Sequence, residues 1–147
     1  MSRFLRWRNL IVVIIALVLP VGCWLTWCVH VSLDAEKTHQ SYIRVLEALT
    51  GFVEENNGRW PRGWDELARF ALGRDPSKYA RFNDLRELRR RVEIRFDVTA
   101  NEVAQMDTEG FSAVKPIGAN YGDDAARIEG LKRAAVRTRK EGTRKRG

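Results

Sequence analysis

Residues 10–33 constrain this chain more than any other feature, because they include no Asp, Glu, Lys or Arg. A helix rises about 1.5 Å per residue, so this segment would extend about 36 Å, which exceeds a bilayer hydrocarbon core of about 30 Å. Pro20 interrupts the segment, but membrane helices tolerate proline where neighbouring groups satisfy the freed carbonyl. We therefore expect residues 10–33 to be a transmembrane helix and the chain to be a single-pass membrane protein.

Residues that precede this segment or lie toward its ends fit the membrane–water interface, where tryptophan is enriched, and the charged residues on its two flanks predict an orientation. The expected interface residues are Arg3, Arg6, Arg8, Trp7, Trp24 and Trp27. The three arginines precede the segment, whereas Asp34, Glu36 and Lys37 follow it. Short loops rich in Lys and Arg stay in the cytoplasm, so residues 1–9 are predicted to be a cytoplasmic stub. The rest of the chain would then lie outside the cytoplasm, tethered to membrane lipid.

A bacterial export signal is the alternative interpretation of the same region. The sequence from Leu19 to Cys23 resembles a bacterial lipobox, which would make Cys23 the lipidated first residue of a mature lipoprotein. Pro20 stands where such a box usually has leucine, and the apolar run continues to Leu33 instead of turning polar. The lipoprotein is therefore the less favoured alternative, and in both cases the domain is exported and tethered.

The formal net charge of +7 suggests a nucleic-acid partner until it is divided along the chain. Residues 1–9 contribute +3, residues 34–130 contribute −3, and residues 131–147 contribute +7. The folded region is thus not basic, and no specific nucleic-acid partner is expected. Four arginines within residues 86–91 are interpreted as a solvated face. The basic tail is either solubilising disorder or a salt-sensitive, unspecific contact for anionic lipid or another polyanion.

An amphipathic helix is predicted immediately after the membrane segment, because apolar residues recur at helical spacing. Its apolar face consists of Tyr42, Val45, Leu46, Leu49, Phe52 and Val53. No Gly or Pro lies between Ser32 and Thr50, so we expect the membrane helix to run directly into this helix. Asn56, Asn57 and Gly58 readily adopt the left-handed conformation that ends a helix.

The remaining patterns predict a small α+β domain over residues 34–136. We expect a turn at 59–63, a helix at 64–72, a helix from Asp75 to about Arg90, a strand at 92–98, a short helix at 100–106 after a Thr99–Glu102 capping box, a strand at 111–116, and a last helix capped by Asp123 or Asp124. The sheet would be antiparallel with two or three strands. Residues 137–147 contain no apolar residue and are predicted to be disordered.

This order of elements resembles that of type IV pilins and type II secretion pseudopilins. The resemblance is strongest from Phe52 to Pro61, followed by Trp64 to Leu67. Its helix-end loop contains Asn56, Asn57, Gly58, Trp60 and Pro61. The resemblance implies a pilin-like fold, in which the long N-terminal helix packs on a small antiparallel sheet. It also implies that the chain acts through protein partners or self-association in an envelope or secretion assembly.

The same family carries a prepilin peptidase site, with Gly before Phe and an acidic residue five positions into the mature chain. Here Asn9 precedes Leu10 and no Glu follows, so peptidase processing and filament assembly are not implied. The pattern supports a pilin-like fold more than a pilin's role, because fold alone does not fix function.

No motif in the sequence predicts an enzyme, a cofactor or a metal. Gly58 and Gly63 have P-loop spacing, but the next two residues are Trp-Asp where phosphate binding needs Lys followed by Ser or Thr. His30 and His39 are nine residues apart and would point to opposite sides of one helix, so that helix cannot offer both to a metal. Catalytic, cofactor-binding and metal-ligating residues are therefore expected to be none.

Overall fold

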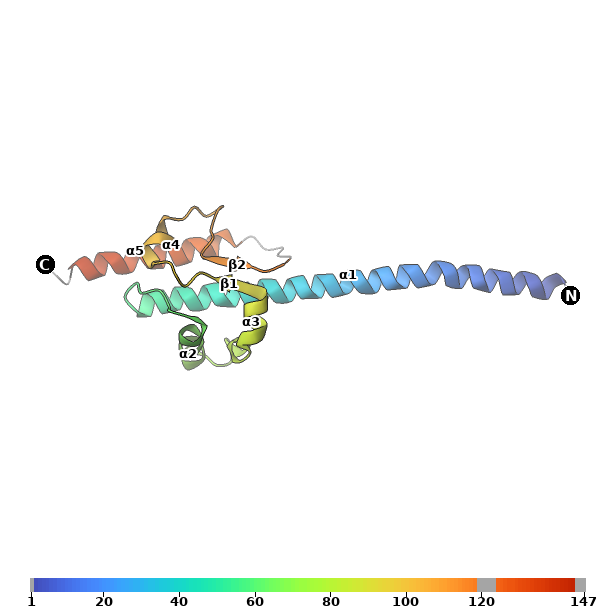
Figure 1. Ribbon diagram of the computed structural model, residues 1–147, viewed down its shortest axis with the longest axis horizontal. Coiled ribbons are helices and arrows are strands. Elements are labelled where there is room, and N and C mark those ends of the chain that lie inside the picture. Colours follow the sequence, from blue (N-terminus) through green and yellow to red (C-terminus); the bar gives the residue numbers. More distant parts are fainter. Residues whose placement is uncertain (1, 119–123, 145–147) are drawn as a thin grey trace. The chain divides into compact units, whose positions relative to one another are not determined.

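The computed structural model describes residues 2–118 and 124–144, with side chains described for 18–118 and 124–137. The chain divides into two compact units, Met1–Asp34 and Ala35–Gly147, called unit 1 and unit 2 below. Helix α1 (Ser2–Glu55) contributes its first part to unit 1 and its last part to unit 2 (Figure 1). The division falls one residue beyond the predicted end of the membrane segment at Leu33.

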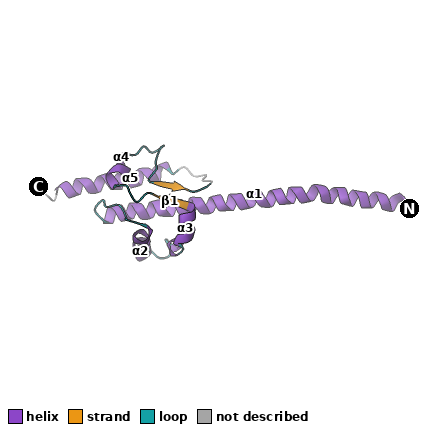
Figure 2. Cartoon of the chain, viewed as in Figure 1, coloured by secondary structure: helices purple, strands orange, loops and turns teal. Residues whose placement is uncertain are grey.

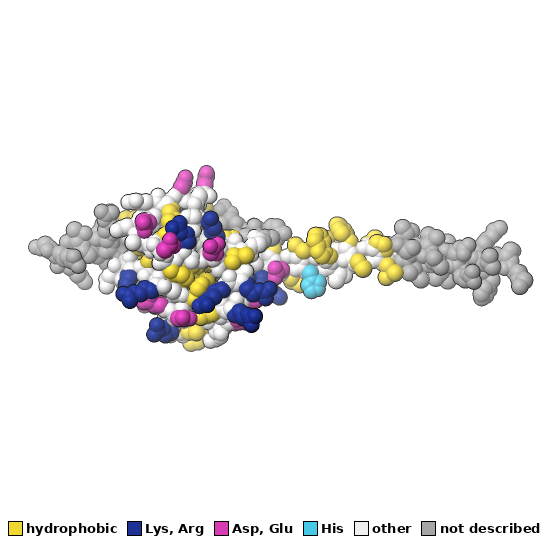
Figure 3. All heavy atoms as spheres, in the orientation of Figure 1, with side chains coloured by type: hydrophobic (Ala, Val, Ile, Leu, Met, Phe, Trp, Pro, Cys, Tyr) yellow, Lys and Arg dark blue, Asp and Glu magenta, His cyan; other side chains and the backbone are white. Residues whose placement is uncertain are grey.

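Unit 1 is the apolar part of α1. Its described large hydrophobic side chains, from Val18 to Leu33, are exposed, and Figure 3 shows hydrophobic surface along one face of this part of the helix. Among the described residues, α1 is the one helix long and apolar enough to cross a membrane. Pro20 lies within it, and the Thr26 hydroxyl donates a hydrogen bond of 2.7 Å to the Gly22 carbonyl oxygen. By length and composition, unit 1 is compatible with a membrane location.

Unit 2 is mostly helical and includes a small antiparallel sheet (Figure 2). Its elements are the end of α1, α2 (Trp64–Arg74), the 3-10 helix η1 (Ala80–Asn83), α3 (Leu85–Arg91), β1 (Val92–Ile94), α4 (Ala100–Gln105), β2 (Val114–Pro116) and α5 (Ala125–Arg144). Strand β1 pairs with β2 so that Val92 lies opposite Pro116 and Ile94 opposite Val114. The predicted α+β class with a long N-terminal apolar helix is confirmed.

The end of α1 forms the centre of unit 2. Helices α2 and α3 lie on one side of it, and β2, α4 and α5 lie on the other (Figure 1). The predicted apolar face is buried, but so are Thr38, Ser41 and Ala48, which the prediction did not include. The reason is that packing covers two sides of α1, where short side chains allow close approach. The helix that was predicted to bury one face is therefore a central helix of unit 2, covered on two sides.

The single helix predicted from Asp75 to Arg90 is wrong, because two aspartates divide the segment. The Asp75 carboxylate accepts hydrogen bonds from the backbone N–H groups of Ser77 and Lys78 at 3.1 and 2.9 Å, which holds a turn before η1. The Asp84 carboxylate then accepts from the Glu87 N–H at 3.0 Å and caps α3.

The predicted capping box is present at the start of α4, where Thr99 and Glu102 bond reciprocally to each other's backbone N–H. Both strands are shorter than predicted. Beyond β1, the Arg95 N–H donates to the Ala113 carbonyl at 2.8 Å, but regular pairing ends at Ile94. The apolar alternation extends over residues 92–98, beyond the last residue that pairs with β2, so the pattern could not reveal where pairing stops.

The predicted disorder from residue 137 onward is also wrong as far as Arg144, because α5 continues through that residue. Packing of Ile128, Leu131 and Ala135 in the core fixes the first turns of α5. Each added residue then gains a hydrogen bond without a new nucleation cost, and Arg, Lys and Glu are good helix formers. Residues 145–147 lie outside the described residues.

Candidate functional site

The helix-end loop stops α1 with the backbone conformation that its sequence predicts. Asn57 and Gly58 have positive φ angles of 53° and 78°. The Gly58 N–H donates to the Val53 carbonyl at 2.9 Å, and the Asn56 side-chain amide donates to the Phe52 carbonyl at 2.9 Å. These bonds satisfy carbonyl groups that the end of a helix leaves without an internal partner.

Trp60 joins this loop to the sheet. Its indole Nε1 donates a hydrogen bond of 2.9 Å to the Arg95 carbonyl oxygen just after β1, and its ring and Pro61 are buried. The Arg62 N–H donates to the Glu66 carboxylate at 2.7 Å, and the Arg59 guanidinium pairs with the same carboxylate. The loop thus holds the end of α1, the start of α2 and the end of β1 together.

Replacing Trp60 with phenylalanine is expected to destabilise unit 2 by about 1–3 kcal/mol, because the Arg95 carbonyl would lose its partner while staying part-buried. Urea unfolding followed by far-UV circular dichroism measures this change. Trp24→Phe is the matched control, because Trp24 is exposed in unit 1. An unfolding midpoint that is the same in both variants would contradict the assigned role of the indole N–H.

The predicted interface tryptophans lie on the surface of unit 1, where Trp24 is 62% and Trp27 is 64% exposed. Cys23 is also exposed, and it lines a shallow apolar hollow with Trp27. The side chains of Arg3, Arg6, Trp7 and Arg8 lie outside the described side chains, although the backbone there is part of α1. Interface binding and Cys23 lipidation stay predictions.

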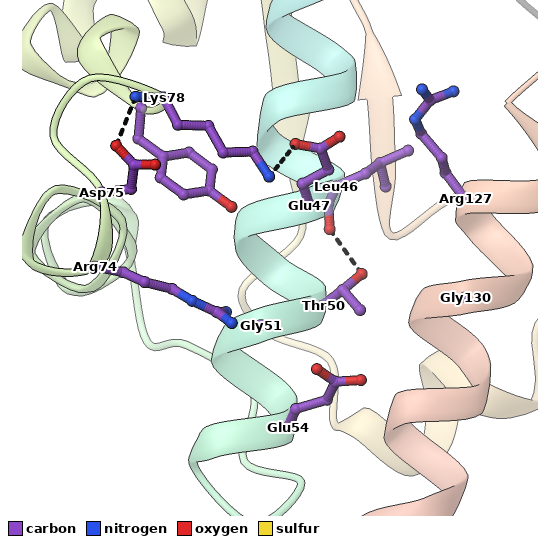
Figure 4. Close-up of a pocket in the computed structure, with 11 residues that line it drawn as sticks. Leu46, Glu47, Thr50, Gly51, Glu54, Arg74, Asp75, Lys78, Arg127 and Gly130 are labelled. Carbon is purple, nitrogen blue, oxygen red and sulfur yellow. Dashed lines mark hydrogen bonds and ion pairs between the residues drawn. The ribbon is translucent and has the colours of Figure 1, made fainter.

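Unit 2 has a groove of about 570 Å³ that residue patterns did not predict. It lies between α1, α5 and the turn that follows α2 (Figure 4). Its walls are Leu46, Glu47, Thr50, Gly51, Glu54, Arg74, Asp75, Lys78, Tyr79, Arg127 and Gly130. Gly51 leaves space on α1 that the Arg74 guanidinium occupies, so a larger residue there would displace Arg74.

Ion pairs line this groove, so its walls carry both cations and anions. Lys78 Nζ lies 3.1 Å and Arg44 Nη1 3.0 Å from Glu47 Oε2 (Figure 4 shows the lysine contact). Burial acts to raise the pKa of Glu47, but hydrogen bonds and charge from these two cations outweigh it and lower the pKa overall. At the far end, Arg74 pairs with Glu55 at 3.2 Å.

A buried acidic group lies where α5 begins. The Asp124 carboxylate is 3.7 Å from His39 Nδ1 of α1 and 3.7 Å from Arg127 Nη1 of α5. Burial and, secondarily, the charge of Asp124 raise the pKa of the nearby Tyr42 hydroxyl to about 12. Asp124 stands at the start of α5, where its backbone carbonyl accepts from the Arg127 and Ile128 N–H groups, and capping by its side chain stays a prediction. Asp123 lies outside the described residues.

Because folding raises the Tyr42 pKa, its contribution to stability is complete below pH 10, its unfolded value, and is lost as the pH rises toward about 12. Titration of tyrosinate absorbance should therefore show one group that ionises near pH 12. Tyr42→Phe is expected to remove that late step. A titration curve unchanged above pH 11 in the variant would contradict the burial of this hydroxyl.

The described side chains include no group of three His, Cys, Asp or Glu that could hold a metal ion. Comparison with protein-family models, curated proteins and solved structures finds no match for this chain. The groove was missed at the sequence level because its walls come from three distant segments. Gly51, set among large apolar residues of the predicted helix, was the one local signal of a close approach.

Proposed function

We propose that this chain is a single-pass membrane protein whose exported, pilin-like domain acts through protein–protein contacts in an envelope or secretion assembly. One observation carries the proposal: a single helix, α1, supplies the exposed apolar surface of unit 1 and the buried centre of unit 2. An apolar helix that is exposed on all sides is costly in water and stable in lipid. Unit 2 is then held directly at the membrane.

Two further features support the pilin-like part of the proposal. The positive φ angles of Asn57 and Gly58 end the long helix, and Trp60 ties the following loop to an antiparallel sheet. The start of the chain differs, since Asn9 and Leu10 replace the residues of a prepilin peptidase site. We therefore propose an anchored accessory component that contacts other proteins, rather than a processed filament subunit.

The groove of Figure 4 is the proposed contact surface, because it is open and carries cations and anions from three elements. A photo-cross-linking amino acid at Arg127, which is exposed on the groove wall, should capture a protein of the same membrane. The matched control carries the cross-linker at Asn101, which is exposed on α4. Cross-linking that is absent at both positions, or equal at both, would contradict a contact role for the groove.

A further inference from the structure

The basic side of unit 2 is attached to the part of α1 that follows the membrane segment. Arg81 Nη1 of η1 lies 3.2 Å from the Ser41 hydroxyl and 3.5 Å from the Lys37 carbonyl oxygen. Arg91 Nη1 of α3 donates to the Thr38 hydroxyl at 3.0 Å. The Thr38 and Ser41 hydroxyls in these bonds belong to buried residues, and the bonds fix η1 and α3 on the first turns of α1 in unit 2.

This attachment ties η1 and α3 to the residues that directly follow the expected membrane segment along the chain. Lys37 follows Leu33, the last residue of the membrane segment, by four residues, which is about 6 Å along a helix. That distance is shorter than the Debye length of about 8 Å at physiological ionic strength. The opposite end of unit 2, where α1 ends at Glu55, is eighteen residues or about 27 Å further along the helix.

Within residues 34–130, positive charge is concentrated in the segment that contains η1 and α3. Residues 78–91 carry a net charge of +4, whereas residues 34–130 as a whole carry −3. Figure 3 shows Lys and Arg side chains over the region where Figure 1 places α3. Arg86 is exposed and Arg90 is 77% exposed, although Arg90 lies 3.6 Å from Glu87. The acids near this region are Asp34, Glu36, Asp65, Asp84 and Glu87.

We propose that the surface formed by Lys37, η1 and α3 is a docking site for the anionic phospholipid headgroups of the bilayer that α1 crosses. Exposed arginine guanidinium groups match headgroup phosphate in charge and hydrogen-bonding geometry. The cations therefore do more than solvate the surface: they hold unit 2 against the membrane. This inference rests on the proposed membrane anchoring, because a chain outside a bilayer would have no such surface at this distance.

The test uses the full chain, with Cys23 and Cys28 replaced by alanine and Asn83→Cys carrying a fluorophore. Asn83 is exposed on η1. The protein is reconstituted in vesicles that contain a headgroup nitroxide quencher, either in phosphatidylcholine alone or with added phosphatidylglycerol. Phosphatidylglycerol should increase quenching at Asn83. An ionic strength of about 1 M should reverse the increase, because it shortens the Debye length to about 3 Å.

The charge variant is R86Q/R90Q, because Arg81 and Arg91 also hold the fold. Each cation near an anionic surface contributes about 1 kcal/mol, a factor of roughly five. We expect the equilibrium constant for contact between this surface and the bilayer, obtained from the quenched fraction, to fall roughly 5- to 25-fold. The range is wide because the ion pair with Glu87 already neutralises part of the Arg90 charge. The matched control is R62Q/R95Q, at the far end of unit 2, where Arg95 similarly pairs with Asp97 at 3.2 Å. This control should leave quenching unchanged.

Two outcomes would overturn the proposal. One is quenching at Asn83 that does not respond to phosphatidylglycerol, and the other is an equal loss of quenching in R86Q/R90Q and R62Q/R95Q. A probe at Asn101 on α4, across α1 from α3, should respond less than the probe at Asn83. Flotation of the vesicles separates this failure from failure of the proposed function. A chain that does not float with neutral vesicles lacks the anchor, whereas one that floats without a lipid-dependent change lacks only the docking surface.

Discussion

Replacing Val21 and Leu25 with arginine is expected to abolish integration of this chain into membranes. Both side chains are more than half exposed on unit 1 near the middle of the apolar segment. An arginine near the centre of a membrane helix costs about 2.5–3.5 kcal/mol in insertion experiments, so two would cost roughly 5–7 kcal/mol. The fraction of protein that resists alkaline carbonate extraction measures the effect.

The matched control, V21I/L25I, keeps the same positions apolar and should stay in the carbonate-resistant fraction. If the arginine variant were equally resistant, the chain would have to be held by something other than its apolar helix, such as an acyl group on Cys23. The mass of the mature protein then decides, because a lipoprotein would begin at residue 23 with added acyl chains. The same pair of variants therefore tests the anchor and its alternative.

Replacing Leu49 with alanine is expected to destabilise unit 2 by about 2–5 kcal/mol. Leu49 is fully buried on the central helix, where packing covers α1 on two sides and little relaxation can fill a cavity. For a domain of this size, the loss lowers the unfolding midpoint by roughly 10–20 °C. Thermal unfolding of the detergent-solubilised chain, followed by near-UV circular dichroism, measures the shift.

Glu54→Ala is the matched control for this variant, because Glu54 lies on the same helix and is exposed. It should change the midpoint by only a few degrees, as surface substitutions usually do. A Leu49→Ala midpoint close to that of the control would mean that residues 42–53 are not the core of the domain. The membrane helix and the domain would then be separate parts of the molecule.

Local patterns predicted the elements whose signals are contained in a short stretch. The Thr99 capping box, the Asn57–Gly58 helix end and the helix that begins at Trp64 all depend on neighbours within a few residues. Longer segments were less predictable where side chains competed with the backbone. Apolar spacing alone predicted one continuous helix from Asp75 to Arg90. In the structure, the Asp84 side chain caps a new helix, α3, within that segment.

The groove and the docking surface depended on tertiary packing, which one sequence does not encode in any local pattern. Glu47 and Lys78 are distant along the chain and pair only because the turn after α2 folds back on α1. Arg86 and Arg90 were recognisable as basic, but the sequence could not show that the helix carrying them is attached to residues 37–41. The bonds from Arg81 and Arg91 to α1 supplied that position.

The central claim is that α1 crosses the membrane and carries unit 2 to the far side. Labelling with a membrane-impermeant maleimide tests it in spheroplasts of a bacterial host that express the C23A/C28A chain with either Ser2→Cys or Asn101→Cys. We predict that the cysteine at position 101 is labelled in intact spheroplasts and that the one at position 2 is labelled only after lysis. Labelling in the reverse order, or of both cysteines only after lysis, would contradict this account.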